Sequence, residues 1–510
     1  MSRKDRKVTL RTSVGFGLTD IMGGGAFTII GAWLLFFYTT FVGLTPVEAA
    51  SIISIARVVD AIISLFIGSL TDNFLKNKLG RKFGRRRFFL LIGSPLMLTY
   101  ILLWVTGMNY WYYLFTYLLF EVVAALVLIP WETLPSEMTK DFNERTKMST
   151  ARMFISGTGT FLATFVPGLL ISYFGNDNSY AYFINGAFFA VLFAVCVFIA
   201  YKSTWENELS PEEEKALLAN SNEPRSFSKT VNSIVEVLAG YVSTFKIKSF
   251  RKHLAIYIFS FTAKDVFNGV FIFFCVYALN ISAATGANLL SLSIIGIPTT
   301  ILSGILFAKI GPSNLFKIAY STMIVCLLSF WAIYLVKPSS MIVVLFVIAG
   351  IYQIGRSMLE FTPWNVYPFI PDVDEIVTKQ RREGLFAAVM TFFRKTSVAI
   401  ATMIVGFVLE FGGFVKGQTT QSPEAIQTIV YTLVIGTIVL LLIALFIAFT
   451  FKLNKQTHAI LVNEIERLKN NGSKSDVDPK TKEVVEELTG YHYDNIWDSE
   501  VAESEKWKIS

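Results

Sequence analysis

Twelve long apolar segments limit how this chain can fold. Each has about 20 or more mostly apolar residues, which is enough to cross the hydrocarbon core of a bilayer as a helix. Hydrophobic residues make up 53% of the chain and charged residues 16%, a composition too apolar for an ordinary soluble multidomain protein. The sequence therefore predicts an all-α, multi-pass membrane protein. The segments are 16–42, 47–73, 87–107, 111–138, 147–173, 179–201, 252–280, 285–309, 313–336, 340–370, 384–411 and 425–451.

Basic residues in the short loops predict the orientation. The loop 76–87 is rich in Lys and Arg, and Lys140, Arg145 and Lys147 follow the fourth segment, whereas the turns after segments one, three and five have neither residue type. Because positive loops stay in the cytoplasm and the number of crossings is even, we expect both termini to be cytoplasmic. The expected location is the cell (inner or plasma) membrane, and the net charge of +7 is ascribed to topology and not to nucleic-acid binding.

A long charged segment divides the twelve crossings into two sets of six. A weak internal repeat supports the division. Ile129-Pro130-Trp131 near the end of segment four is similar to Thr362-Pro363-Trp364 in segment ten. After the last crossing the sequence predicts an amphipathic helix over 460–469 and then a flexible polar segment. The expected divisions are an N-terminal half (1–201), a central cytoplasmic loop (202–251), a C-terminal half (252–451) and a cytoplasmic tail (452–510).

Several ionisable residues lie inside the apolar segments. A charged side chain at the bilayer centre costs about 2.5–3.5 kcal/mol on insertion scales, so such residues usually bind, couple or pair. Arg57 and Asp60 share a helix face at i, i+3, which leaves a local ion pair as the alternative to a coupling site. Lys264 and Asp265 are adjacent and point in different directions, so each is expected to meet its own partner. The set is Asp20, Arg57, Asp60, Arg152, Lys264, Asp265, Arg356, Glu360, Arg394 and Lys395, with Glu121, Glu132 and Glu410 assigned less firmly because an interface could lie close to them.

No catalytic or metal-binding pattern is present in the sequence. Cys196, Cys275 and Cys326 lie in apolar segments without paired spacing or a Cys/His cluster. There is no nucleophile with a nearby base and no phosphate-binding glycine loop. The sequence therefore favours a transporter that has no cofactor and no bound metal over an enzyme.

The chain resembles the glycoside-pentoside-hexuronide:cation symporters, which have the major facilitator fold. The resemblance spans the twelve-segment region and is carried by short motifs in both halves. These are Gly15-Phe16-Gly17 with Asp20, Ala56-Arg57-Val58-Val59-Asp60-Ala61, the Gly80–Arg87 loop, Thr362-Pro363-Trp364, Pro371-Asp372-Val373, Arg381–Phe386 and Phe392-Phe393-Arg394-Lys395.

The resemblance implies a sugar site and a coupling site. Asp20 and Arg152 are implied to bind sugar hydroxyls, a task that suits charge-assisted and bidentate hydrogen bonds. Trp131 is implied as a stacking face for a sugar ring, and Lys395 is implied near the substrate or the coupling site. Trp364, the counterpart of Trp131 in the second half, is added to the expected substrate site.

The coupling region departs from the pattern of the sodium-using members. Those members often have a second carboxylate one turn after the aspartate that matches Asp60, and another just before the Ile-Pro pair of segment four, where this chain has Ser64 and Leu128. Sodium requires several hard oxygen ligands. Asp60, assisted by Arg57 and Ser64, is therefore expected to couple transport to H⁺ more readily than to Na⁺.

The firmly assigned intramembrane charged residues include more Arg and Lys than Asp and Glu, which suggests an acidic glycoside such as a uronide as the substrate. Arg356, Glu360 and Arg394 join Lys264 and Asp265 as further candidate site residues. The alternatives are a lysolipid transporter of the same fold and a sugar sensor that does not transport. The expected partners are a small sugar and membrane lipid, and the protein is expected to act as a monomer.

Overall fold

The computed structural model describes residues 7–72, 74, 78–139, 141–175, 178–206, 242–379 and 382–497. Within these ranges the secondary structure is helical and includes no β-strand. Most of the segment expected to form the central loop, residues 207–241, lies outside the described residues, as do Lys76, Lys140 and Arg381. The fold-class prediction of an all-α protein is confirmed.

The described residues of the N-terminal half form helices consistent with six crossings, and a short helix, α5 (Lys78–Phe83), lies in the basic loop between the second and the third. The first crossing is interrupted between α1 and α2 and contains two π-helical stretches. Its parts are α1 (Leu10–Gly17), α2 (Asp20–Ile29), η2 (Ile30–Leu34), α3 (Leu35–Phe37) and η3 (Tyr38–Val42), and the others are α4 (Pro46–Asp72), α6 (Arg87–Leu96) with η5 (Met97–Trp104), α7 (Tyr110–Met138), α8 (Phe142–Phe174) and α9 (Ser179–Ser203).

The C-terminal half repeats this organisation. The long helix α14 contains a break at Gly311, whose φ of 80° is unfavourable for other residues, and Pro312 starts the next crossing. The elements are α12 (Lys248–Phe273) with η6 (Phe274–Ala278), α13 (Ala283–Ser291) with η7 (Leu292–Ile295), α14 (Gly296–Val336), α15 (Met341–Val366) with η8 (Tyr367–Phe369) and α16 (Ile370–Thr378), α17 (Glu383–Phe411), and α18 (Pro423–Tyr431) with η9 (Thr432–Gly436) and α19 (Thr437–Thr450).

The number of crossings is consistent with twelve. Ten stretches of the described residues are long and apolar enough to span a bilayer. One of them, Ala283–Val336, has 54 residues and holds two crossings separated at Gly311. The 27-residue helix α4 supplies one more, although it is less apolar because it carries Arg57 and Asp60.

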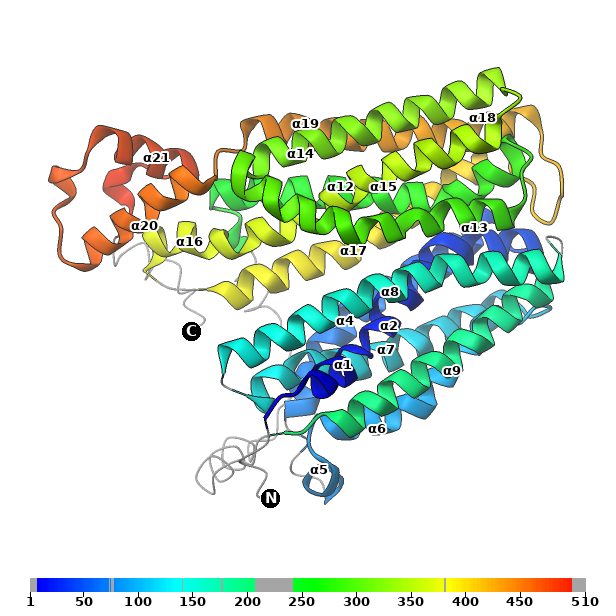
Figure 1. Ribbon diagram of the computed structural model, residues 1–510, viewed down its shortest axis with the longest axis horizontal. Helices are drawn as coiled ribbons and strands as arrows, with labels where there is room; N and C mark the ends of the chain where they lie inside the picture. Colours follow the sequence, from blue (N-terminus) through cyan, green and yellow to red (C-terminus); the bar gives the residue numbers. More distant parts are fainter. Residues whose placement is uncertain are drawn as a thin grey trace.

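The two halves form separate helical bundles that meet at one end and diverge at the other (Figure 1). They touch mainly where α4 packs on α17 and where α8 packs on α13. Small residues allow close approach at both places: a Cβ atom at Gly406 would lie 2.4 Å from Ala50 Cβ, and one at Gly168 would lie 3.0 Å from Ala287 Cβ. We call the end where the bundles meet the closed end, and the opposite end, which bears the tail, the open end.

Polar contacts also join the halves at the closed end. The hydroxyls of Thr40 and Tyr277 lie 3.2 Å apart, and the Gly417 N–H donates to the Thr39 carbonyl at 3.0 Å. Glu410 accepts from the Val47 N–H at 2.7 Å and so caps the start of α4. Glu410 thus lies at a helix end, and its carboxylate is used in holding the halves together.

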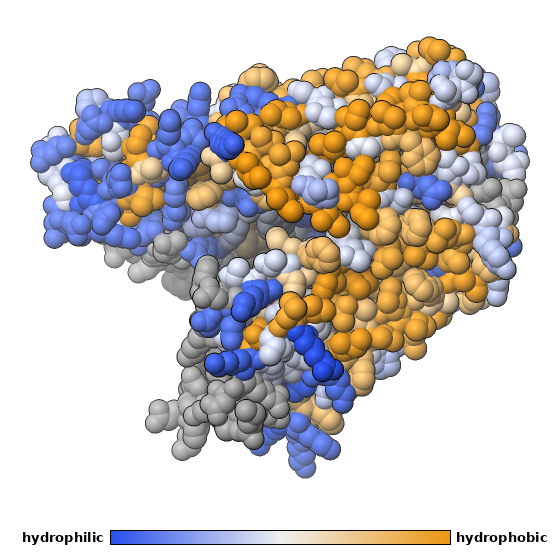
Figure 2. All heavy atoms as spheres, viewed as in Figure 1, coloured by the Kyte–Doolittle hydropathy of each residue, from blue (hydrophilic) through white to orange (hydrophobic). Residues whose placement is uncertain are grey.

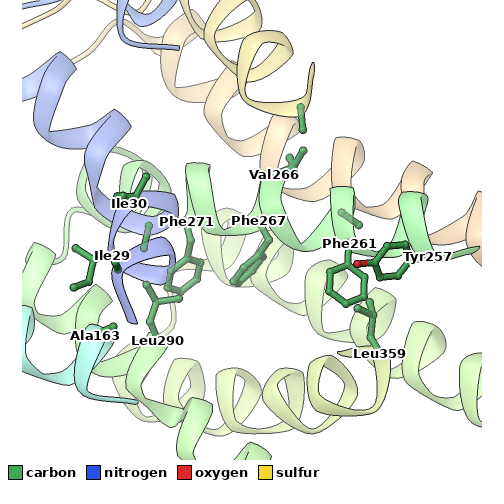
Figure 3. Packing of buried hydrophobic residues seen from close by; sticks show 14 of the residues in the cluster. Ile29, Ile30, Ala163, Tyr257, Phe261, Val266, Phe267, Phe271, Leu290 and Leu359 are labelled. Atoms are coloured by element: carbon green, nitrogen blue, oxygen red, sulfur yellow. The ribbon is translucent and has the colours of Figure 1, made fainter. Parts of the chain in front are cut away.

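Buried apolar side chains from both halves complete this contact. Figure 3 shows Phe271 and Leu290 of the C-terminal half close to Ile29 and Ile30 of the N-terminal half. All four are less than one-tenth exposed and belong to one hydrophobic cluster. In a bilayer such contacts gain from close packing more than from the exclusion of water.

The tail is folded as far as residue 497, which corrects part of the sequence prediction, and residues 498–510 lie outside the described residues. The expected amphipathic helix is present as α20 (Lys455–Lys469), but the polar sequence after it forms η10 (Lys474–Asp476), α21 (Pro479–Thr489) and η11 (Tyr493–Asn495). Asp478 caps α21, and Gly490 ends it with a φ of 81°. Burial of Val485 and Leu488 stabilises a helix whose composition alone suggested disorder.

The tail is attached to the C-terminal half. Lys469 Nζ lies 2.6 Å from Glu375 on α16, and Lys248 Nζ at the start of α12 lies 2.7 Å from Glu487 on α21. Tyr493 donates its hydroxyl to Glu464, and burial raises the pKa of Tyr493 to about 12, so that its phenol stays protonated at neutral pH. The tail therefore extends the rim of the C-terminal half at the open end (Figure 1).

Candidate functional site

A cavity of about 850 Å³ lies between the two halves. Its walls come from α2, η2, α4, α7 and α8 on one side and from α12, α15 and α17 on the other. Figure 2 shows the molecule hollowed between the bundles toward the open end, with hydrophilic edges there, whereas the outer sides of the bundles are mostly hydrophobic. A polar cavity enclosed by lipid-facing apolar surfaces is suited to carrying a polar solute across a bilayer.

Arg152 on α8 organises the wall in the N-terminal half. Its Nε lies 3.1 Å from Asp20 Oδ2 and its Nη2 lies 2.8 Å from Glu132 Oε1. Asp20 is nearly buried and does not line the cavity, while Arg152 and Glu132 do. Asp20 therefore orients Arg152, and the exposed groups available to a solute are the guanidinium and Glu132.

Trp131 is not on the cavity wall, contrary to the role that the resemblance implies. It is 0% exposed, its indole N–H donates to the Phe16 carbonyl at 2.9 Å, and its ring stacks on Phe16. The guanidinium of Arg152 lies over the ring, with Cζ 4.5 Å from its centroid. Successive helix positions are about 100° apart, so the residue that faces the cavity here is Glu132, one position on.

Trp364 on α15 does line the cavity. The residue is 43% exposed, and its ring packs edge-to-face against Tyr257 with the ring centroids 5.7 Å apart. Of the two Pro-Trp marks in the sequence, the second therefore supplies an aromatic side chain within reach of a solute.

The structure brings together Asp60, Ser64 and Lys395. Lys395 Nζ lies 2.7 Å from Asp60 Oδ2 and donates to Ser64 Oγ at 2.7 Å. Ser64 Oγ donates to Asp60 Oδ1 at 3.1 Å. Because Lys395 is on α17 and Asp60 on α4, this contact joins the two halves, and no other ion pair does so among the residues the structure describes.

Arg57 pairs with Glu121 and not with its helix neighbour Asp60. Arg57 Nη1 lies 3.3 Å from Glu121 Oε1, and its guanidinium lies 4.3 Å from the centroid of the Phe27 ring. Glu121 is 1% exposed, near the middle of α7. From the sequence Glu121 is assigned less firmly than most of the other intramembrane charges, because an interface could lie close to it. The signal that could have placed it is helical spacing, since Glu121 precedes Leu128 by two turns on a face that lines the cavity.

The wall in the C-terminal half carries two further ion-pair groups. Arg394 makes a double contact with Asp265 at 2.5 and 2.9 Å. Lys264 and Arg356 both contact Glu360 Oε1, at 3.2 and 3.1 Å. Lys264 and Asp265 thus have different partners, as their adjacent positions suggested. Arg356 also donates from Nη1 to Asn268 Oδ1 at 3.1 Å.

The charges around the cavity are closer to balance than the sequence suggested, because Glu121 and Glu132 must be counted among them. The balance is uneven in space. In the C-terminal half two cations share Glu360, whereas in the N-terminal half Arg152 has two carboxylates. The cationic lining residues are Arg57, Arg152, Lys264, Arg356, Arg394 and Lys395, and the anionic ones are Asp60, Glu121, Glu132, Asp265 and Glu360.

The basic loop contacts its own half in this conformation. Arg85 and Arg86 pair with Glu137 at 2.5 and 2.7 Å. The backbone N–H groups of Arg85, Arg86 and Arg87 donate to the Glu206 carboxylate at 2.7–2.9 Å. The described residues include no group of three or more His, Cys, Asp or Glu side chains placed to hold a metal ion.

Sequence comparison identifies the family. Residues 15–455 match the profile of the family described as MFS/sugar transport protein. An uncharacterised symporter of Bacillus subtilis, YnaJ, is 25% identical over 91% of this chain and 96% of its own. A glucuronide carrier protein homolog of Escherichia coli is 25% identical over 91% of this chain and 97% of its own. The sodium-dependent lysophosphatidylcholine symporter 1 of Gallus gallus is 22% identical over 81% and 82%.

Solved structures share the fold. A bacterial homolog of the lysosomal transporter Spinster, in an inward-facing conformation, aligns with a TM-score of 0.58 and 13% identity over 87% of this chain and 97% of its own. The xylose transporter XylE of E. coli, in a partially occluded inward-open conformation, aligns with a TM-score of 0.55 and 13% identity over 88% and 98%. The two helical bundles, the cavity between them and the match over nearly the whole helical region agree, and this chain belongs to the MFS/sugar transport protein family of membrane transporters.

Proposed function

We propose that this transporter is a symporter that takes up a glycoside or an oligosaccharide together with a proton by alternating access. The observation that carries the proposal is the cavity between the halves, where the Arg152 guanidinium and Glu132 are accessible to a solute. With both termini in the cytoplasm, the open end faces inward. The names of the bacterial relatives, a symporter and a glucuronide carrier homolog, support this class of substrate and this mode of transport.

Sugar recognition is assigned to both walls. A guanidinium and a carboxylate offer charge-assisted hydrogen bonds to neighbouring hydroxyls, and Asp20 holds the guanidinium in place from behind. The exposed face of Trp364 can stack on the apolar side of a sugar ring. The stacking role moves to Trp364 because Trp131 is buried.

A proton is proposed as the coupling ion because the Asp60 site already holds a cation. The Lys395 ammonium lies 2.7 Å from both Asp60 Oδ2 and Ser64 Oγ, the oxygens that a sodium ion would need. Leu128, also on the cavity wall, offers no oxygen. A sodium ion would have to displace an ammonium group and would find few hard ligands.

An acidic glycoside is proposed as the substrate class. Lys264 and Arg356 share the single carboxylate of Glu360, so this part of the wall has one positive charge in excess. A sugar carboxylate carries one negative charge and would complete the pairing. A phosphate monoester would carry about −1.5 to −2 at neutral pH and fits the excess less well.

Uptake by the purified protein in proteoliposomes tests the proposal. Labelled methyl β-D-glucuronide, methyl β-D-glucoside and lysophosphatidylcholine are compared with and without sodium and with and without a protonophore. We expect glucuronide uptake that a protonophore abolishes and that sodium removal leaves unchanged. Strict sodium dependence overturns proton coupling, uptake of the lysolipid alone overturns the sugar assignment, and binding without counterflow identifies a sensor.

A further inference from the structure

Glu121 has fewer interactions that stabilise its anionic form than the other carboxylates of the cavity. Among the described residues neither of its side-chain oxygens has a hydrogen bond of normal geometry. The Tyr117 hydroxyl, one turn earlier on the same helix, is the donor that interacts with the carboxylate, and the ion pair with Arg57 is 3.3 Å long. Asp60 accepts from Ser64, and Asp265 and Glu360 accept from arginines. A buried carboxylate that lacks well-formed hydrogen bonds has its anionic form least stabilised, so protonation costs least there.

The position of Glu121 connects it to the contact between the halves. Arg57 lies one turn before Asp60 on α4, and the two interact electrostatically. Asp60 in turn holds Lys395 of the other half. The titratable and charged groups that face Glu121 are Arg57 and Asp60 from α4, Tyr117 from its own helix and Lys395 from α17.

We propose that Glu121 is the residue that binds the coupling proton, and that its protonation is transmitted through Arg57 and Asp60 to Lys395. The proton comes from the water of the cavity, of which Glu121 forms part of the wall, and binds to a carboxylate oxygen. Arg57 then loses its partner and turns to Asp60, which lies one turn away on the same helix and interacts with Arg57 more strongly than Asp265 does. Asp60 is shared between Arg57 and Lys395, and the ion pair that joins α4 to α17 is weakened.

This inference rests on the proposed proton-coupled sugar transport and names the group that carries the proton. It assigns a different role to Asp60 from the one the sequence suggested. Asp60 is already satisfied by Lys395 and Ser64, so it serves to link the halves while Glu121 titrates. If Asp60 binds the proton, replacing Asp60 should abolish coupling, whereas if Glu121 binds it, replacing Glu121 should.

Coupling and exchange are measured separately in proteoliposomes with labelled methyl β-D-glucuronide. We expect Glu121→Gln to retain counterflow, which needs no net proton movement, and to lose accumulation driven by a pH gradient by about tenfold or more. Glu132→Gln on the same helix is the matched comparison, and it should raise the KM for the sugar while accumulation still responds to the gradient. Accumulation by Glu121→Gln equal to that of the unmodified protein overturns the inference.

A measurement without substrate separates failure of this inference from failure of the proposed function. Infrared spectra of the purified full-length protein, recorded while the pH is lowered, should show a protonated-carboxyl band that is missing in Glu121→Gln and present in Glu132→Gln. If the band persists in Glu121→Gln, the proton binds elsewhere, whatever the substrate is. Since Glu121→Gln leaves Arg57 buried without its partner, Glu121→Gln/Arg57→Gln, which removes both charges, is measured in parallel and should also lack the band.

Discussion

At the scale of single residues, the cavity is lined by ion pairs with distinct geometries. Arg152 holds two carboxylates with different nitrogens, Arg394 holds one carboxylate with two contacts, and Lys395 bridges a carboxylate and a hydroxyl. Arginine can present several donors in a fixed plane, whereas lysine is a compact point charge. The residue type at each position therefore determines how many partners can be held at once.

Arg152→Lys tests this at the proposed sugar site. A lysine cannot contact Asp20 and Glu132 in the present geometry at the same time, so the KM for the transported glycoside should rise by about tenfold, or about 1.4 kcal/mol of binding free energy. Initial rates of uptake measure the change.

Arg145→Lys is the control for that substitution. Arg145 is exposed on the same helix and donates to the Thr139 carbonyl outside the cavity, so its replacement should leave the KM unchanged. An equal KM for Arg152→Lys and the unmodified protein would remove Arg152 from the binding site.

At the scale of helices, the packing of α4 on α17 sets how closely the halves approach. Gly406 lets α17 lie against Ala50 and Pro46, and Ser54 Oγ donates to the Ala399 carbonyl at 2.7 Å along the same contact. The carboxylate and ammonium of the Asp60–Lys395 pair come from these two helices as well. A change in the separation of α4 and α17 therefore changes the distance between Asp60 and Lys395 on the cavity wall.

Gly406→Ala should hinder closure at this contact. The added Cβ would lie 2.4 Å from Ala50 Cβ and 2.8 Å from the Pro46 carbonyl oxygen, so α4 and α17 must move apart. Overpacking of this kind costs about 1–3 kcal/mol, and we expect counterflow to slow by roughly fivefold or more. Equilibrium binding of the sugar should change much less, because Gly406 does not line the cavity.

Gly436→Ala provides the comparison for that variant. Gly436 also lies in a membrane helix of the C-terminal half, but its nearest neighbour is 4.0 Å from the position of an added Cβ. Normal counterflow in both variants would show that the α4–α17 contact need not be this close during transport.

At the scale of the whole molecule, the structure is one of the two arrangements that alternating access requires. The halves are joined at the closed end and separated at the open end, where the molecule is hollowed between the bundles. Opening the other side requires loss of the Thr40–Tyr277 and Thr39–Gly417 contacts and separation of the apolar cluster around Phe271 and Ile30. The Asp60–Lys395 pair lies between the two ends and is shared by both halves.

Cross-linking the closed end should stop transport. Thr40 and Tyr277 lie on opposite halves with their hydroxyls 3.2 Å apart, so cysteines in both positions can be joined by a short bifunctional thiosulfonate. We expect counterflow to be lost on cross-linking and restored by a reductant. Thr40→Cys and Tyr277→Cys, treated singly with the same reagent, should keep counterflow. Transport by the cross-linked protein would show that this end does not open.

The organisation of the helices was accessible from sequence because lipid leaves few alternatives. A segment such as Pro423–Thr450 must be helical in a bilayer, and its length and apolarity locate it without reference to its neighbours. The groupings of Asp20 with Arg152 and of Asp60 with Ser64 followed from helical spacing and from the family resemblance. The tail was partly misjudged, since α21 is stabilised by caps and by contacts with distant residues and not by its composition.

What the sequence by itself determined is the class of protein, the placing of the crossings and the types of charged group available inside the membrane. Tertiary structure alone decided which of these groups face one another. Trp131 contacts Phe16, and Glu132 lines the cavity in its place. Arg57 pairs with Glu121 on another helix, and Lys395 pairs with Asp60 of the other half. The physical reason is that a buried charge takes the partner that packing brings within reach, and packing between helices is set by contacts far apart in the chain.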